Sequence, residues 1–503
     1  MQALDIGLSA RAMRGCALAL AATLVACAPV GPNFKPAELQ QVQSFSTAPS
    51  TAQTVSADSA FGESQRYAPG GAVPADWWEL FQSEALDKLV RAAIADSPTL
   101  DAARAALLQA RENLNVQYAV LYPSVDAVAG ITREQVTGAS VGQPKSPPSM
   151  FTLYNASVNV SYAIDVAGGA RRELEALLSQ IDYQRLQLEA AWLALTGNVV
   201  TAALQEASLR AQIRATREVV QSQQDILELV QRQFELGAVA RADVLAQSAL
   251  LAQTRAALPP LEKALAQTRN ALAALVGRFP VGAGLPESEL AQLTLPHELP
   301  LSLPSELARQ RPDIRAAEAL LHQASAAIGV AEAAKYPRLT LTSSFGSNAL
   351  SSSALFGSSA AAWSLGAGVL QPIFHAGALE AQRRAAVAAY DQAYAQYRQT
   401  VLAALHNVAD VLDALDYDAH TLKAQAEAEA SARASLELAR RQFELGASSQ
   451  LALLNAERQA QQAQIGLVQA QAARLADTAA LYQALGGGWW QRASNIEKGS
   501  VQR

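Results

Sequence analysis

The hexapeptide Gln233-Phe234-Glu235-Leu236-Gly237-Ala238 recurs as Gln442-Phe443-Glu444-Leu445-Gly446-Ala447, a shift of 209 residues (442 − 233). The same shift relates Val276-Gly277 to Leu485-Gly486, so the likeness extends well beyond six residues. A period above 200 residues is far too long for a solenoid of short repeats. The chain is therefore predicted to hold two copies of one large module.

Long segments without proline lead into both copies of the hexapeptide. Arg171 to Leu236 has only Gly197 as an interior glycine, and Ala378 to Leu445 has no glycine or proline. Each segment predicts a helix of about 100 Å at 1.5 Å per residue. Three-four spacing, typical of a coiled-coil seam, relates nine residues of the second segment. They are Tyr390, Tyr394, Tyr397, Val401, Ala404, Val408, Val411, Leu415 and Leu422.

Each long helix is predicted to turn at Leu-Gly-Ala and return, over 242–276 in the first copy and 449–485 in the second. Gly237 and Gly446 are well placed to be the left-handed residue that ends a helix. Pro259-Pro260 should interrupt or kink the first return helix, because proline removes backbone hydrogen bonds and clashes with the preceding turn. Val468-Gln469, the equivalent pair, should leave the second return helix straight.

Strand patterns precede each helical hairpin. Val158, Val160 and Tyr162 alternate with polar residues, a period of two that is typical of a half-buried strand. A looser strand around 125–131 comes before it, with a Gly-, Pro- and Ser-rich loop over 133–150. The second copy repeats this order over 339–345 and 363–369, with a Ser-rich loop at 346–361.

The four predicted strands have about the length that crosses a bilayer at a tilt. Four strands cannot close a barrel, and an open sheet edge cannot lie in hydrocarbon because its backbone groups would be unpaired. Strands in lipid therefore require an oligomer. The alternative is two hairpins in water that pack on the helices.

The N-terminus reads as a lipoprotein export signal. Arg11 and Arg14 precede a short apolar run, which closes with small residues at Cys27 and predicts cleavage after residue 26 and covalent lipid on Cys27. The alternative is a plain secretory signal with an incidental cysteine. Residues 27–73 lack a sustained period and predict a lipid-anchored extended tether.

Composition excludes several classes of protein. Without residues 1–26 the chain has 37 Lys and Arg against 44 Asp and Glu, a charge of about −7 with no basic cluster, so nucleic acid is not an expected partner. Removal of Cys16 and lipidation of Cys27 leave no cysteine for a disulfide, a metal or catalysis. No nucleophile elbow or Gly-rich phosphate loop occurs in the sequence, so neither an enzyme nor a cofactor is expected.

These patterns give a domain plan. A signal peptide (1–26) and a tether (27–73) precede repeat 1 (74–277), which has strands at about 123–163 and a helical hairpin at about 169–277. A connecting equatorial segment (278–311) leads to repeat 2 (312–488), with strands at about 337–371 and a hairpin at about 377–486, and a tail (489–503) ends the chain.

Several stretches carry a resemblance to a known family. They are Val30-Gly31-Pro32-Asn33-Phe34-Lys35-Pro36, Asp76-Trp77-Trp78-Glu79-Leu80-Phe81, Arg311-Pro312-Asp313-Ile314-Arg315-Ala316-Ala317-Glu318, Ile328-Gly329-Val330-Ala331, Gln371-Pro372-Ile373-Phe374 and Ala484-Leu485-Gly486-Gly487-Gly488-Trp489. Together they run from the lipidation signal nearly to the C-terminus. In them the chain resembles a TolC-like outer-membrane factor, in the lipoprotein branch related to OprM and NodT.

The resemblance implies an α+β membrane protein, a homotrimer in which four strands per chain close a twelve-stranded β-barrel that continues into a periplasmic α-helical coiled-coil barrel. It implies an exit duct for drugs and other small molecules, supplied by a periplasmic adaptor protein and an inner-membrane pump of the RND type. Leu236, Gly237, Ala238, Leu445, Gly446 and Ala447 match the turns that contact the adaptor.

Relatives close the periplasmic aperture with rings of acids past the second turn. Here the matching positions hold Ala452 and Asn455, whereas Asp243 lies past the first turn. Three Asp243 carboxylates in a trimer would attract cations, and the alternative is that Asp243 favours the positive N-terminus of its own helix.

Alternatives to an efflux duct remain. One is a duct for protein secretion with an ABC exporter, and another is a lipoprotein coiled-coil scaffold, which leaves the strands unexplained. A helical stripe from His406 through Asp410 and Asp413 to His420 has spacing that suits a metal, but polar stripes are expected on such helices, and no metal site is predicted.

Overall fold

The computed structural model describes residues 28–36, 52–137, 142, 145, 147–302 and 304–492. The signal peptide, Cys27 and the last residues of the chain lie outside these ranges. The chain divides into two compact units, one of Met1–Ala37, Ala106–Gln184 and Ala317–Tyr397, and one of Glu38–Ala105, Arg185–Ala316 and Arg398–Arg503.

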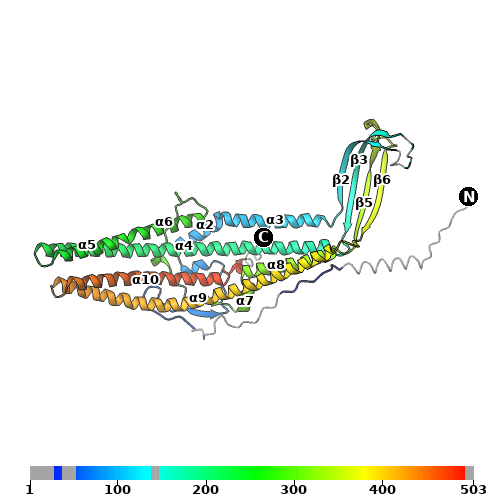
Figure 1. The fold of residues 1–503 in the computed structure, drawn as a ribbon. Helices are drawn as coiled ribbons and strands as arrows, with labels where there is room; N and C mark the ends of the chain where they lie inside the picture. The colour runs from blue at the N-terminus through cyan, green and yellow to red at the C-terminus, as the bar shows by residue number, and fades with distance from the viewer. Residues whose placement is uncertain are drawn as a thin grey trace, which may run out of the picture. The chain divides into compact units, whose positions relative to one another are not determined.

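The helices of the described residues (Figure 1) are η1 (Trp77–Phe81), α2 (Glu84–Asp96), α3 (Pro98–Ala119), α4 (Gly169–Glu235), α5 (Arg241–Ala256), α6 (Leu258–Leu275), η3 (Leu290–Gln292), α7 (Pro304–Gln310), α8 (Pro312–Ala333), η4 (Ser352–Ala354), α9 (Ala378–Glu444) and α10 (Gln450–Ala484). The strands are β1 (Arg66–Pro69), β2 (Ser124–Val136), β3 (Ser149–Ile164), β4 (Glu298–Leu301), β5 (Arg338–Ala349) and β6 (Ala361–Leu370). None of the described helices combines the length and apolarity that a membrane span requires.

The first unit contains an antiparallel sheet in the order β2-β3-β5-β6. Strands β3 and β5 join the two copies of the module, with Val158 opposite Phe345. The predicted strands are confirmed, but two predicted loops were too long. The ladder continues to the pair Val136 and Ser149 in the first hairpin and to Ser347 and Ala361 in the second, because paired backbone groups extend a strand into polar sequence.

The long helices are confirmed: α4 and α9 have 67 residues each. The first return helix breaks between α5 and α6 at Ala257, just before Pro259-Pro260, whereas α10 runs unbroken for 35 residues. In the α9 seam, Tyr397, Val408 and Leu415 are buried as predicted, but Tyr394 is 39% exposed. The copies therefore share a plan and differ in the continuity of one helix.

The predicted extended tether is wrong over residues 52–73. Strand β1 pairs in parallel with β4, so the connecting segment also carries a strand. Arg474 on α10 is fully buried, and its Nη2 donates to Thr54 Oγ1 at 3.0 Å and to the Glu63 carbonyl at 2.7 Å. A buried cation needs such partners. Residues 52–73 provide both partners. The Glu63 partner is a backbone carbonyl, and a backbone contact leaves no pattern in the sequence.

An aromatic core anchors the second unit. The Trp77 and Tyr482 rings stack with centroids 5.6 Å apart, and both side chains are fully buried.

The predicted tail begins later than expected, because residues 489–492 are helical. There Trp489 Nε1 donates to the Gln310 carbonyl at 2.6 Å, and the Arg492 guanidinium lies 4.1 Å from the Trp192 ring centroid.

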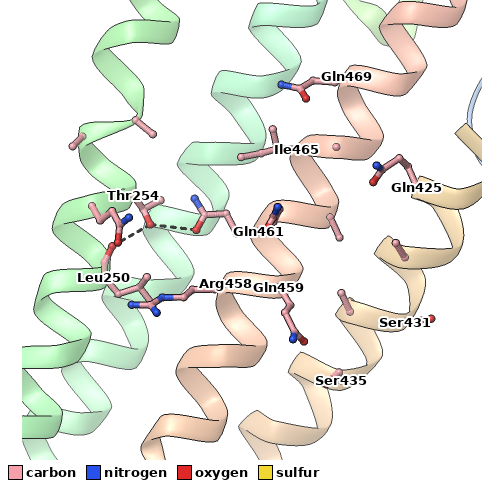
Figure 2. Close-up of a pocket in the computed structure, with 18 residues that line it drawn as sticks. Leu250, Thr254, Gln425, Ser431, Ser435, Arg458, Gln459, Gln461, Ile465 and Gln469 are labelled. Atoms are coloured by element: carbon pink, nitrogen blue, oxygen red, sulfur yellow. Dashed lines mark hydrogen bonds between the residues drawn. The ribbon is translucent and has the colours of Figure 1, made fainter. Parts of the chain in front are cut away.

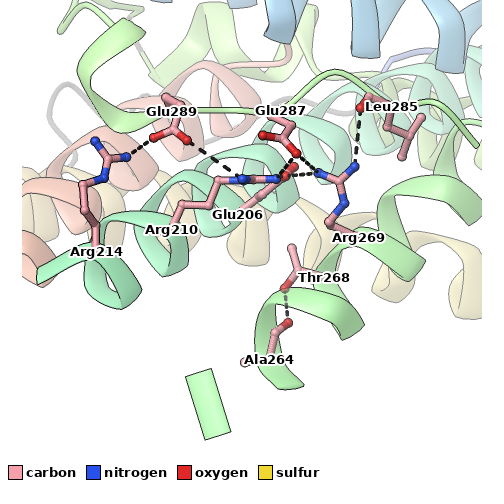
Figure 3. A network of polar contacts seen from close by, with 9 residues as sticks. All are labelled: Glu206, Arg210, Arg214, Ala264, Thr268, Arg269, Leu285, Glu287 and Glu289. Carbon is pink, nitrogen blue, oxygen red and sulfur yellow. Dashed lines mark hydrogen bonds and ion pairs between the residues drawn. The ribbon is translucent and has the colours of Figure 1, made fainter. Parts of the chain in front are cut away.

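An ion network fixes the segment after α6 onto α4 (Figure 3). The Glu206 carboxylate is fully buried, and its Oε1 accepts from Arg210 Nε at 3.0 Å and from Arg269 Nη1 at 2.6 Å. Arg210 Nη2 also pairs with Glu287 Oε1 at 2.9 Å. Glu206 thus has the two cationic partners that a buried carboxylate requires, and Arg269 holds the C-terminal half of α6 to α4.

Candidate functional site at the hairpin tips

The first hairpin turns through a hydrogen-bonded helix end. Gly237 has φ +74°, and its N–H donates to the Phe234 carbonyl at 2.9 Å. The Ala238 N–H donates to the Gln233 carbonyl at 2.8 Å. These two bonds define a Schellman motif, in which the left-handed residue is normally glycine. Leu236 beside it is 85% exposed.

The second hairpin repeats the same turn. Gly446 has φ +71°, and the Ala447 N–H donates to the Gln442 carbonyl at 2.8 Å. Leu445 is 84% exposed, almost the same as its counterpart in the first hairpin. A Cβ added at either glycine would meet nothing within 4 Å, so the glycines serve the backbone rather than packing. Each tip presents an exposed leucine on a rigid turn.

The return helices begin with different caps. In the first hairpin, Asp243 Oδ2 accepts from the Ala240 N–H at 2.9 Å. In the second, the equivalent of Asp243 is Ala452, and Ser449 caps the helix instead, its Oγ accepting from the Ala452 N–H at 3.3 Å. The two hairpins thus use opposite halves of a capping box. The cap accounts for Asp243 locally and is compatible with a role at the aperture.

The apolar support beneath the tips is unequal. Ile226, Val230, Phe443 and Leu453 form a buried cluster that joins α4, α9 and α10. Phe443 is 5% exposed, whereas its counterpart Phe234 is 43% exposed. The identical hexapeptides therefore have different surroundings, which the repeat alone did not reveal.

A buried polar cluster lies between the hairpins, and sequence reasoning missed it. Gln247 Nε2 donates to Glu457 Oε2 at 3.2 Å, and Gln450 Nε2 donates to Gln247 Oε1 at 3.1 Å. Glu457 Oε1 is buried without a hydrogen-bond partner. Burial raises the pKa of Glu457 and outweighs the lowering by the Gln247 hydrogen bond and the Arg440 charge. The repeat gave no signal for this cluster, because the shift of 209 residues relates Gln247 to Ala456 and Gln450 to Arg241.

Replacing Glu457 with Gln is expected to stabilise the protein at neutral pH. The raised pKa means that the folded state binds this proton more tightly than the unfolded state, so its contribution is present at acid pH and lost as pH rises through the folded pKa. A neutral amide avoids a buried, partly unpaired charge, whose cost is on the order of 1 kcal/mol.

Melting temperatures of the wild type and Glu457→Gln across pH 4 to 8 measure this effect. The melting temperature of Glu457→Gln should exceed that of the wild type by a margin that grows as pH rises. Gln461→Glu, one helical turn further along α10, is a control for charge in general. A gap that is constant with pH would contradict the prediction.

A groove of about 1410 Å³ runs between α5, α9 and α10 (Figure 2). Alanine, serine and glutamine dominate its lining, and Arg458 is its only charged residue. Thr254 Oγ1 lies 3.4 Å from Gln461 Oε1 across the groove.

The other predicted site residues lie apart from this cluster. Asn455 is exposed on α10. Of the polar stripe on α9, His406 Nδ1 pairs with Asp410 Oδ1 at 3.1 Å, and both side chains are exposed. Within the part of the chain that the structure describes, no three His, Cys, Asp or Glu side chains gather as metal ligands. Cys27 lies outside the described residues.

Known proteins resemble this chain along most of its length. The family model described as outer membrane efflux protein matches residues 89–278 and 303–487. The pyoverdine export outer membrane protein OpmQ of Pseudomonas putida is 34% identical over 418 residues, which cover 82% of this chain and 88% of that protein. The probable outer membrane lipoprotein SilC of Salmonella typhimurium is 30% identical, with 82% and 88% coverage.

Solved structures show the same likeness. The outer-membrane channel OprN aligns with a TM-score of 0.81 at 27% identity, covering 92% of this chain and all of that chain. The outer membrane protein VceC from Vibrio cholerae aligns with a TM-score of 0.77 at 28% identity, covering 83% and 99%.

Proposed function

Because the chain belongs to the outer membrane efflux protein family, it is an outer-membrane component of an efflux system, and we propose that three copies form a passive exit duct for small molecules. The expected family and fold class are confirmed, and so are the outer-membrane location and the periplasmic helical extension. The substrate range, the trimer, the anchor and the partners of this chain belong to the proposal.

The four-stranded sheet carries the proposal. Strands β2 and β6 each have one edge without a partner among the described residues. In hydrocarbon such edges must be paired, because water is absent. If three copies pair β6 of one chain with β2 of the next, the sheet has twelve strands and no unpaired strand edge. A closed barrel of that size has room for an aqueous lumen.

The hairpin tips suit contact with a periplasmic adaptor. Leu236 and Leu445 are exposed on turns held by two backbone hydrogen bonds each. Exposed apolar side chains on a rigid turn can be buried by a partner at little entropic cost. We assign the adaptor contact to 236–238 and 445–447, with an RND-type pump behind the adaptor.

The substrate class follows from relatives only in outline. OpmQ is named for pyoverdine export, and another relative in P. putida is named a toluene efflux pump outer membrane protein. These names span pyoverdine and toluene, so the duct is proposed to pass small molecules that its pump selects. Covalent lipid on Cys27 is proposed to anchor the chain, as the name of the lipoprotein SilC also suggests. The duct is proposed to act without an enzymatic step.

Conductance of the purified protein in planar bilayers tests the proposal. A duct gives discrete channels, whereas a scaffold gives none. In these channels Asp243→Asn is expected to reduce cation preference, because three carboxylates per trimer lose their charge. The asparagine oxygen can still accept from the Ala240 N–H, so the helix cap is retained.

A second variant separates charge from position. Adding Ala452→Asp to Asp243→Asn moves the acid to the equivalent place in the second hairpin and should restore cation preference. Unchanged selectivity in Asp243→Asn would contradict the aperture role of Asp243 while leaving the duct itself intact.

A further inference from the structure

We propose that Arg172, Glu175 and His322 form a docking site for residues 29–34 of the same chain, and that this segment, termed the strap, fastens helix α4 to helix α8. The strap precedes the part of the chain that the family model matches. All of these residues belong to the first compact unit.

Arg172, at the start of α4, binds backbone carbonyl groups of the strap. Its side chain is 5% exposed. Nε donates to the Val30 carbonyl at 3.0 Å, and Nη2 donates to the Gly31 carbonyl at 3.2 Å and to Asn33 Oδ1 at 2.9 Å. Nη1 pairs with Glu175 Oε2 at 2.6 Å. The planar guanidinium suits this fan of acceptors, which a lysine could not span.

His322 on α8 completes the site. The Phe34 ring stacks on its imidazole with centroids 4.3 Å apart and planes 13° from parallel. His322 Nε2 lies 2.9 Å from Glu175 Oε1. Burial raises the pKa of Glu175, but hydrogen bonds from Arg172 and His322 outweigh it and hold the pKa below its usual value. The Glu175 carboxylate therefore joins the two side chains that contact the strap, and through His322 it links α4 to α8.

The strap and α8 approach each other closely at two glycines, Gly31 and Gly329. A Cβ added at Gly329 of α8 would lie 2.8 Å from the Arg172 side chain, and one added at Gly31 would lie 2.4 Å from the Gly329 Cα. The Val30 N–H also donates to the Ala167 carbonyl at 3.0 Å. The strap therefore occupies a site with little room for side chains at these two positions.

The strap has a structural consequence. Helix α4 belongs to the first copy of the module and α8 to the second, so the strap joins the copies beside the β3–β5 pairing that also joins them. Pro29 is two residues after Cys27, about 7 Å of extended chain. An anchor on Cys27 would then be attached to a fixed point of the folded body.

Hydrogen exchange of the full-length protein in detergent tests the proposal, read on the peptide that contains Val30. Arg172→Ala is expected to speed exchange of this amide at least tenfold. Arg383→Ala is the matched control, because Arg383 pairs with Glu380 at 2.8 Å in the same unit and should leave Val30 exchange unchanged.

Gly329→Ala provides a second variant that does not weaken the helix. Alanine favours a helix interior by about 1 kcal/mol over glycine, but its Cβ intrudes on the Arg172 side chain that binds the strap. Faster Val30 exchange in this variant supports the docking site even if Arg172→Ala fails to fold. Wild-type exchange in Gly329→Ala would overturn the proposal. Neither result depends on transport.

Discussion

Replacement of Gly446 by valine is expected to abolish efflux while leaving trimers in the membrane. A β-branched residue at φ +71° is strained by about 1–2 kcal/mol, so the Schellman turn should open and Leu445 should change direction. The cost is local, because the added side chain meets nothing within 4 Å. Drug resistance of a strain that depends on this protein should fall to the level of a deletion strain.

Two measurements accompany this prediction. Native electrophoresis should show normal amounts of trimer, and channels in a planar bilayer should conduct normally. Gly446→Asn is the control, since asparagine tolerates the left-handed region and should retain most resistance. Full drug resistance in the valine variant would refute an adaptor role for this tip.

Replacement of Trp77 by alanine is expected to cost about 3–5 kcal/mol, the range for large aromatic side chains removed from a core. Trp77 is fully buried and stacks on Tyr482 of α10. Its loss opens a cavity where η1, α4 and α10 meet and should lower the melting temperature sharply.

Trp77→Phe is the matched variant. Trp77 Nε1 is buried without a hydrogen-bond partner, so phenylalanine keeps an aromatic ring and removes an unsatisfied donor. Its effect should be much smaller than that of alanine. Equal destabilisation by the two variants would mean that the indole shape, not aromatic burial, stabilises this region.

Periodicity predicted the regular elements well because their residues repeat locally. Alternation around Val158 indicated β3, and the absence of proline between Arg171 and Leu236 indicated α4. Pro259-Pro260 placed the break in the first return helix to within a few residues. Each signal arises from neighbours in sequence, so no distant contact is needed to see it.

Long-range contacts to backbone groups were not predictable in this way. Arg172 and Arg474 each hold a segment from the N-terminal region, largely through carbonyl oxygens that every residue possesses. The segment therefore appeared to be an unstructured tether. The Gln247 and Glu457 pair was missed for a related reason, since isolated polar residues on a long amphipathic helix normally face solvent.

The break at Ala257 gives the two hairpins different mechanical properties. Pro259 and Pro260 donate no hydrogen bonds, so the α5–α6 junction lacks the ladder that stiffens α10 throughout. Under a sideways force at its tip, the return arm of the first hairpin can hinge at one residue, whereas that of the second must bend as a whole rod. The two copies of the repeat thus provide one compliant return arm and one stiff return arm.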